Sequence, residues 1–152
     1  MNLEMDKNIF DSETVNIAVI DNGCPEAVMG TTWFRVYKDT LPKGHILKSS
    51  KCDEMFKFGP SKTYESKERI EIPVSLGKMQ TTMKVCLVDC DIPLLVSSQI
   101  LENWESSQSY KDCTLTIGKT GETFKLMKLA GGHFGLRLQM DPTDPKLERC
   151  SF

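Results

Sequence analysis

The sequence lacks several features that would assign it at once to a common functional class. It has no apolar run near the roughly 18 residues that a membrane-spanning helix needs, so we expect no membrane partner. Its 19 basic and 21 acidic residues are scattered. Without a basic stripe, direct binding of nucleic acid is not expected. Residues 1–13 carry acids where a signal peptide has an apolar run, which predicts a cytoplasmic, intracellular protein.

The sequence also lacks the residue spacings that are typical of metal sites and nucleophilic sites. The only two histidines, His45 and His133, have no neighbouring Cys or Asp that would suggest a triad or a metal site. None of the six cysteines lies in a C-x-x-C motif or at metal-ligand spacing from a histidine. We therefore expect free thiols, no metal and no cofactor, with Cys24 a small core residue rather than a nucleophile.

Length and composition favour one folded domain. A chain of 152 residues can bury its own core, and 39% hydrophobic with 26% charged residues is typical of globular proteins. The last residues contain Asp-Pro turns and no periodicity. We predict an N-terminal extension at 1–14, a single domain at 15–139 and a flexible tail at 140–152.

The clearest periodicity is that of β-strands. Apolar residues alternate from Val15 and the run ends at Ile20, and a series of hairpins is expected from Met55 to Val88. Further short strands are predicted at 113–117, 123–126 and 134–138. Residues 31–37 could form a short helical segment capped by a threonine, and 38–53 are expected to be a loop. Ser97 or Ser98 could cap the one well-formed helix. These patterns predict an all-β (mainly β) domain, barrel-like or closed, with one short late helix.

An acid stands where the first strand ends. Asp21, Asn22 and Gly23 break the alternation with three turn-forming residues, so a tight loop carries a carboxylate at the end of an apolar strand. Asp-Asn-Gly is also a common β-turn sequence, and on spacing alone a structural turn is the favoured interpretation.

The surrounding segments change that interpretation. The chain contains, in order, Gly23-Cys24, Trp33, a Phe-Lys-Phe-Gly at 56–59, an Asp-Ile-Pro-Leu-Leu at 91–95 and a Gly-His-Phe at 132–134. With these segments the sequence resembles the retropepsin-like aspartic proteases, of the type encoded within retrotransposon polyproteins. The resemblance covers residues 15–117 and extends more loosely to 138.

The resemblance implies a fold, a site and an activity. It implies a closed retropepsin-like barrel whose flap hairpin covers an extended peptide or polyprotein substrate, with Phe58, Gly59, Pro60 and Ser61 in the flap. It also implies a homodimeric aspartic endopeptidase in which each chain supplies one catalytic Asp21, within an active-site loop completed by Asn22 and Gly23. Its setting would be the cytoplasm, including a retrotransposon-derived particle.

Two positions depart from the pattern of that family. Asn22 stands where the family has Ser or Thr, whose hydroxyl braces the two active-site loops across the dimer axis, and Ser97 stands where the family usually has Gly. Asn22 favours an alternative, a catalytically weak or inactive retropepsin-like module kept for dimerisation or peptide binding. A third hypothesis is a β-barrel interaction domain unrelated to proteases, with the Asp21 loop as a surface turn.

Overall fold

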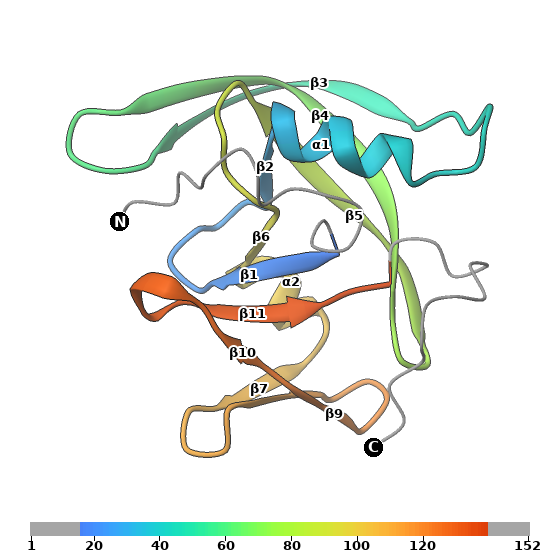
Figure 1. The fold of residues 1–152 in the computed structure, drawn as a ribbon, viewed down its shortest axis with the longest axis vertical. Coiled ribbons are helices and arrows are strands. Elements are labelled where there is room, and N and C mark those ends of the chain that lie inside the picture. The colour runs from blue at the N-terminus through green and yellow to red at the C-terminus, as the bar shows by residue number, and fades with distance from the viewer. Residues whose placement is uncertain (1–15, 140–152) are drawn as a thin grey trace.

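The computed structural model describes residues 16–139, and these residues are mainly β (Figure 1). The predicted extension at 1–14 and tail at 140–152 lie outside the described residues. The elements in chain order are β1 (Ile17–Asp21), β2 (Val28–Gly30), α1 (Thr31–Asp39), β3 (Ser49–Lys57), β4 (Thr63–Leu76), β5 (Met79–Val88), β6 (Leu95–Ser97), α2 (Ser98–Asn103), β7 (Ser106–Ser109), β8 (Thr114–Ile117), β9 (Glu122–Lys125), β10 (Met127–Lys128), the 3-10 helix η2 (Ala130–Gly132) and β11 (Phe134–Arg137).

The strands form two open sheets rather than the predicted closed barrel. The larger sheet has eight strands in the order β10-β11-β1-β6-β2-β5-β4-β3, and the smaller has three in the order β7-β8-β9. One isolated bridge, Ser75 to Gln139, joins β4 to the residues just after β11. A single bridge does not make a continuous ladder. Among residues 16–139, the outer side of β3 has no neighbouring strand, so the sheet is not closed.

Asp21, the acid that the sequence singled out, lies at the end of a strand in the centre of the large sheet. β1 runs parallel to β6 with Asp21 beside Ser97, and antiparallel to β11. β6 in turn lies antiparallel to β2, which runs parallel to β5. The ends of β1 and β6 therefore meet at the same edge of the sheet, and α2 starts directly there.

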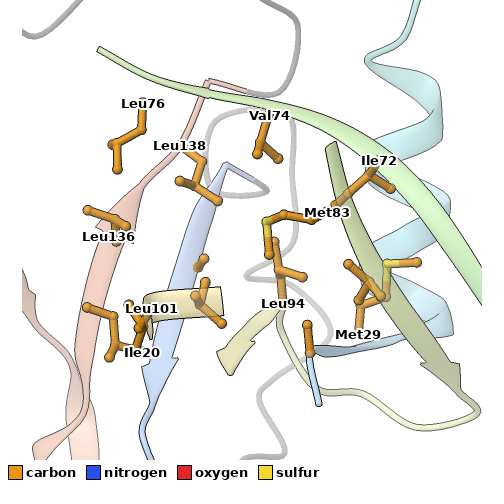
Figure 2. Close-up of a cluster of buried hydrophobic side chains, with 14 of the residues drawn as sticks. Ile20, Met29, Ile72, Val74, Leu76, Met83, Leu94, Leu101, Leu136 and Leu138 are labelled. Carbon is orange, nitrogen blue, oxygen red and sulfur yellow. The ribbon is translucent and has the colours of Figure 1, made fainter. Parts of the chain in front are cut away.

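Alternation along β1 places side chains in two hydrophobic cores. Ala18 and Ile20 belong to the larger core, whereas Val19, one residue out of phase, belongs to a smaller one. Figure 2 shows part of the larger core, where side chains from β4, β5, β11 and α2 converge. The smaller core lies under the β3–β4 hairpin and contains Phe56 and Phe58.

The longer helix is the early one, which corrects the prediction of a single well-formed late helix. α1 has nine residues and α2 has six. Trp33 and Tyr37, four residues apart, are fully buried, and their stacked rings have centroids 5.3 Å apart. Tertiary packing of this face stabilises α1 although its residues are modest helix formers.

The predicted caps had mixed outcomes. Gly30 is the N-cap of α1 without a side-chain cap, while the hydroxyl groups of Thr31 and Thr32 donate to Asp89 and Asp91. Ser97 does cap α2, as predicted, because its hydroxyl accepts a hydrogen bond from the Ile100 N–H at 3.3 Å.

The predicted hairpins are confirmed. β3, β4 and β5 follow one another as antiparallel neighbours, with turns at 58–62 and at Gly77-Lys78. β3 begins at Ser49, so the loop predicted at 38–53 ends earlier than expected. Within 16–139, no helix has the length and apolar character to cross a membrane.

Candidate active-site loop and cavity

Asp21 is the last residue of β1 and is followed by a tight loop. Its Oδ1 accepts a hydrogen bond from the Gly23 N–H at 3.1 Å, and its carbonyl accepts one from the Cys24 N–H at 3.3 Å. The first bond is a local turn between an Asp side chain and the backbone two residues on. It fixes the direction of the carboxylate while Asp21 remains half-buried.

The far end of the loop is attached to α2. The carbonyl of Cys24 accepts hydrogen bonds from the Ser98 N–H at 3.0 Å and from the Ser98 hydroxyl at 3.4 Å. Because Ser97 is also the register partner of Asp21, both ends of the loop are held against the start of α2. The loop is thus supported by backbone hydrogen bonds to a regular element.

A cavity of about 310 Å³ lies between this loop and the β3–β4 hairpin. The loop and the hairpin tip lie on the same side of the molecule (Figure 1). The residues that line it come from two segments, Asp21, Gly23, Cys24, Pro25 and Glu26 from the loop and Glu54, Met55, Phe56, Lys57 and Phe58 from the hairpin.

The cavity brings together some of the residues predicted from the sequence and not others. Asp21, Gly23 and Phe58 line it, whereas Asn22 and the predicted flap residues at 59–61 do not. The side of the hairpin that faces Asp21 is therefore the end of β3 rather than the tip.

Phe58 is more firmly packed than a flap tip should be. Its ring is buried and lies near Phe56 and Tyr64, with centroids at 6.1 and 5.8 Å, and its N–H donates to the Lys62 carbonyl at 3.0 Å. Pro60, at the tip, is exposed. The exposed part of the hairpin thus begins at Pro60.

Glu26 and Glu54, two acids that the sequence did not single out, line the cavity, and Arg69 lies beside both. Arg69 of β4 is 3.7 Å from a carboxylate oxygen of Glu26 and 3.8 Å from one of Glu54. These ion pairs connect the loop after Asp21 to the hairpin through one guanidinium. No sequence motif marked them, because their meeting depends on how β3 and β4 lie over residues 21–26.

The Cys24 thiol is placed as a donor rather than a nucleophile. It donates to the Glu26 carbonyl at 2.9 Å. Burial raises the pKa of this thiol above its ordinary value, the hydrogen bond to Glu26 lowers it, and the nearby charges of Asp21 and Glu26 raise it again. A thiol with a raised pKa is a poor nucleophile at neutral pH.

The other sequence candidates lie elsewhere. His45 lines a separate cavity beside the end of α1, and His133 follows η2. Residues 16–139 contain no group of three or more His, Cys, Asp or Glu that could hold a metal ion. A Cβ built on Gly23 would meet Asp21 Oδ1 at 3.5 Å, an ordinary contact. The fold of one chain therefore does not require glycine there, and its role across a dimer axis stays a prediction.

Chemically, the site offers a carboxylate of fixed direction beside a hollow that is partly apolar and covered by a hairpin. Such a group can hold a water molecule or accept a proton next to an extended ligand. Comparison of the chain with protein-family models, with curated proteins and with solved structures finds no match.

Proposed function

We propose that the chain is an aspartic endopeptidase of the retropepsin-like kind that works as a homodimer, each chain supplying Asp21. The observation that carries the proposal is the cavity in which the Asp21 loop faces the β3–β4 hairpin. The order of segments resembling the retrotransposon proteases supports it, because residues from two of these segments, Asp21, Gly23 and Cys24 from one and Phe56 to Phe58 from the other, line the same cavity.

One carboxylate per chain makes a second chain necessary for the chemistry. Two Asp21 side chains facing each other would share one proton, because two like charges so close cannot both ionise. The ionised carboxylate removes a proton from a water whose oxygen attacks the peptide carbonyl carbon, while the protonated one donates to the carbonyl oxygen. The resulting diol collapses when the nitrogen takes a proton and the C–N bond breaks, which leaves an acid and an amine.

The position of β3 fits a peptide substrate. β3 is an edge of the eight-stranded sheet, so its backbone is available to pair with an added extended strand. Met55, Phe56 and Phe58 give the cavity apolar walls against which substrate side chains can pack. We expect the scissile peptide to lie between this strand and the Asp21 loop.

The direct test is cleavage of a randomised peptide library at acid and neutral pH, with and without an inhibitor of aspartic proteases. Asp21→Asn should abolish cleavage and preserve the fold, because the Asn Oδ1 can still accept the Gly23 N–H. Asp39→Asn, which changes an exposed carboxylate at the end of α1, is the matched control and should cleave normally. Cleavage that survives in Asp21→Asn would refute the proposal.

The second candidate is a catalytically silent module that dimerises or binds peptides, and Asn22 favours it. The side chain is exposed in the single chain and cannot supply the hydroxyl of the resembling family. If the missing hydroxyl is what weakens the site, Asn22→Thr should tighten the dimer in sedimentation and raise the rate of cleavage. If the parent cleaves nothing and Asn22→Thr restores nothing, the silent module replaces the enzyme.

A further inference from the structure

The first half of β5 is paired with a neighbouring strand on one side only, although β5 is not the last strand of the large sheet. β4 pairs with β5 along the whole range from Met79 to Leu87, but β2 pairs with it only from Cys86 to Val88. β2 begins only at Val28. Pro25, three residues earlier, has no N–H with which to extend the pairing with β5 toward the N-terminus. Before Cys86, one side of β5 therefore has no neighbouring strand among residues 16–139.

The direction of the unpaired backbone groups follows from one hydrogen bond. The Cys86 N–H donates to the Ala27 carbonyl at 2.9 Å, so the backbone groups of Cys86 point toward the side occupied by β2. Because alternate residues of a strand direct their N–H and C=O to the same side, Lys84 and Thr82 present theirs to the open side. Both residues are exposed.

The open edge lies beside a hollow of about 610 Å³ between β5 and α2. We call it the β5–α2 groove. Of its apolar residues Ile100 is partly exposed, whereas Met83 and Trp104 are buried, and most of the lining is polar. Its remaining lining is Glu26, Ala27, Arg69, Thr81, Thr82, Lys84, Ser97, Gln99, Asn103 and Lys119. The groove is separate from the cavity at Asp21, although Glu26 touches both.

Positive charge dominates the groove. Its lining contains Arg69, Lys84 and Lys119 against the single acid Glu26. Glu26 lies 3.7 Å from Arg69, which leaves the exposed Lys84 and Lys119 as the charges offered to a ligand. An extended ligand that carries carboxylates would complement both the charge and the free backbone edge.

From this juxtaposition, we propose that the β5–α2 groove binds an extended acidic segment of a partner protein by strand addition to β5. The segment's backbone pairs with the N–H and C=O groups of Thr82 and Lys84. Its carboxylates reach Lys84 and Lys119, and an apolar side chain packs against Ile100. This binding does not use Asp21, so the proposal is independent of the proposed peptidase activity.

Fluorescence anisotropy with a labelled peptide of alternating Glu and Val tests the proposal on the full chain. We expect saturable binding that weakens as salt is added, and none for the matched peptide of alternating Lys and Val. The double variant Lys84→Glu with Lys119→Glu should weaken binding roughly tenfold or more, because reversing two charges replaces attraction with repulsion. Lys111→Glu, an exposed lysine outside the groove, should bind like the parent.

The backbone part of the proposal is tested on the peptide, so that the protein stays intact. N-methylation at alternate peptide bonds removes half of the peptide's N–H donors. Two such peptides can be made, and the one whose methyl groups replace the N–H groups that face β5 should not bind. Asp21→Asn should bind like the parent. Binding that ignores both the lysine reversals and N-methylation would overturn the proposal. So would an absence of peptide binding together with self-association that the lysine reversals abolish, since a second copy would then be the occupant.

Discussion

Gly30 offers a sharp test of how β2 is held against the segment that precedes β6. A Cβ built at this position would clash with the Cys90 carbonyl oxygen and would lie 2.8 Å from both the backbone N and O of Ile92. All three are backbone atoms, so no flexible side chain can move aside. Gly30→Ala must therefore push β2 away and weaken the hydrogen bond from the Gly30 N–H to the Ile92 carbonyl, now 3.2 Å long.

The expected cost can be worked out from known effects. Overpacking a core costs about 1–3 kcal/mol, and the hydrogen bond contributes about 0.5–1.5 kcal/mol. Alanine also reduces the conformational entropy of the unfolded chain, which stabilises the folded state by about 0.4–1 kcal/mol. We expect Gly30→Ala to lower the free energy of unfolding by about 2 kcal/mol in a urea titration. Gly23→Ala is the control and should not lower the free energy of unfolding, because its Cβ meets only an ordinary contact and the reduced freedom of the unfolded chain favours the folded state by about 0.4–1 kcal/mol. Equal stability of the two variants would refute the packing argument.

Three further predictions concern thiols and a helix cap. Cys24 should be alkylated slowly at neutral pH, and Asp21→Asn should accelerate the alkylation by removing a charge that raises the Cys24 pKa. Site-resolved mass spectrometry measures both rates, and equal rates would contradict the prediction. Burial, and next the neighbouring Cys52, raises the pKa of Cys86 to about 11. As pH rises, the Cys86 thiol ionises at a lower pH in the unfolded chain than in the folded one, so the free energy of unfolding should fall from about pH 8.5 toward pH 11. This fall should be smaller in Cys86→Ala. Ser97→Ala should cost about 1 kcal/mol, seen as a lower Tm, since the α2 cap is lost.

Features encoded by neighbouring residues were predictable from the sequence. The end of β1 at Asp21 followed from an apolar alternation broken by three turn-forming residues. The turn at Gly77 followed from a glycine between two alternating runs, and Gly77 does adopt a φ of 60°. In both cases the signal lies within one continuous stretch of the chain, so pairing with distant segments does not alter it.

The helix α1 shows where local propensity was a poor guide. Thr31, Thr32, Val36 and the aromatic residues of this segment are modest helix formers. The sequence predicted a short helical segment at 31–37, and the structure confirms it and extends it to Asp39. Its stability comes from Trp33 and Tyr37, which share one face four residues apart and enter the larger core. The spacing was visible in the sequence, but the surface that it packs against was not.

Sheet closure and the lining of the Asp21 cavity could not be obtained from the sequence. Both depend on which distant strands become neighbours. The sheet ends at β3 instead of closing because β4 meets the residues after β11 only at Ser75 and Gln139. The ion pairs of Arg69 with Glu26 and Glu54 likewise join residues from three separate segments.

The two departures from the retropepsin pattern differ in what the structure says of them. Ser97 is buried, is the register partner of Asp21 and caps α2 through its hydroxyl, a bond that glycine could not make. This serine therefore has a structural role beside the loop, and its presence says little against activity. Asn22 is exposed, and nothing in residues 16–139 explains an amide at this position. The choice between enzyme and silent module therefore rests on residue 22, and Asn22→Thr is the variant that separates them.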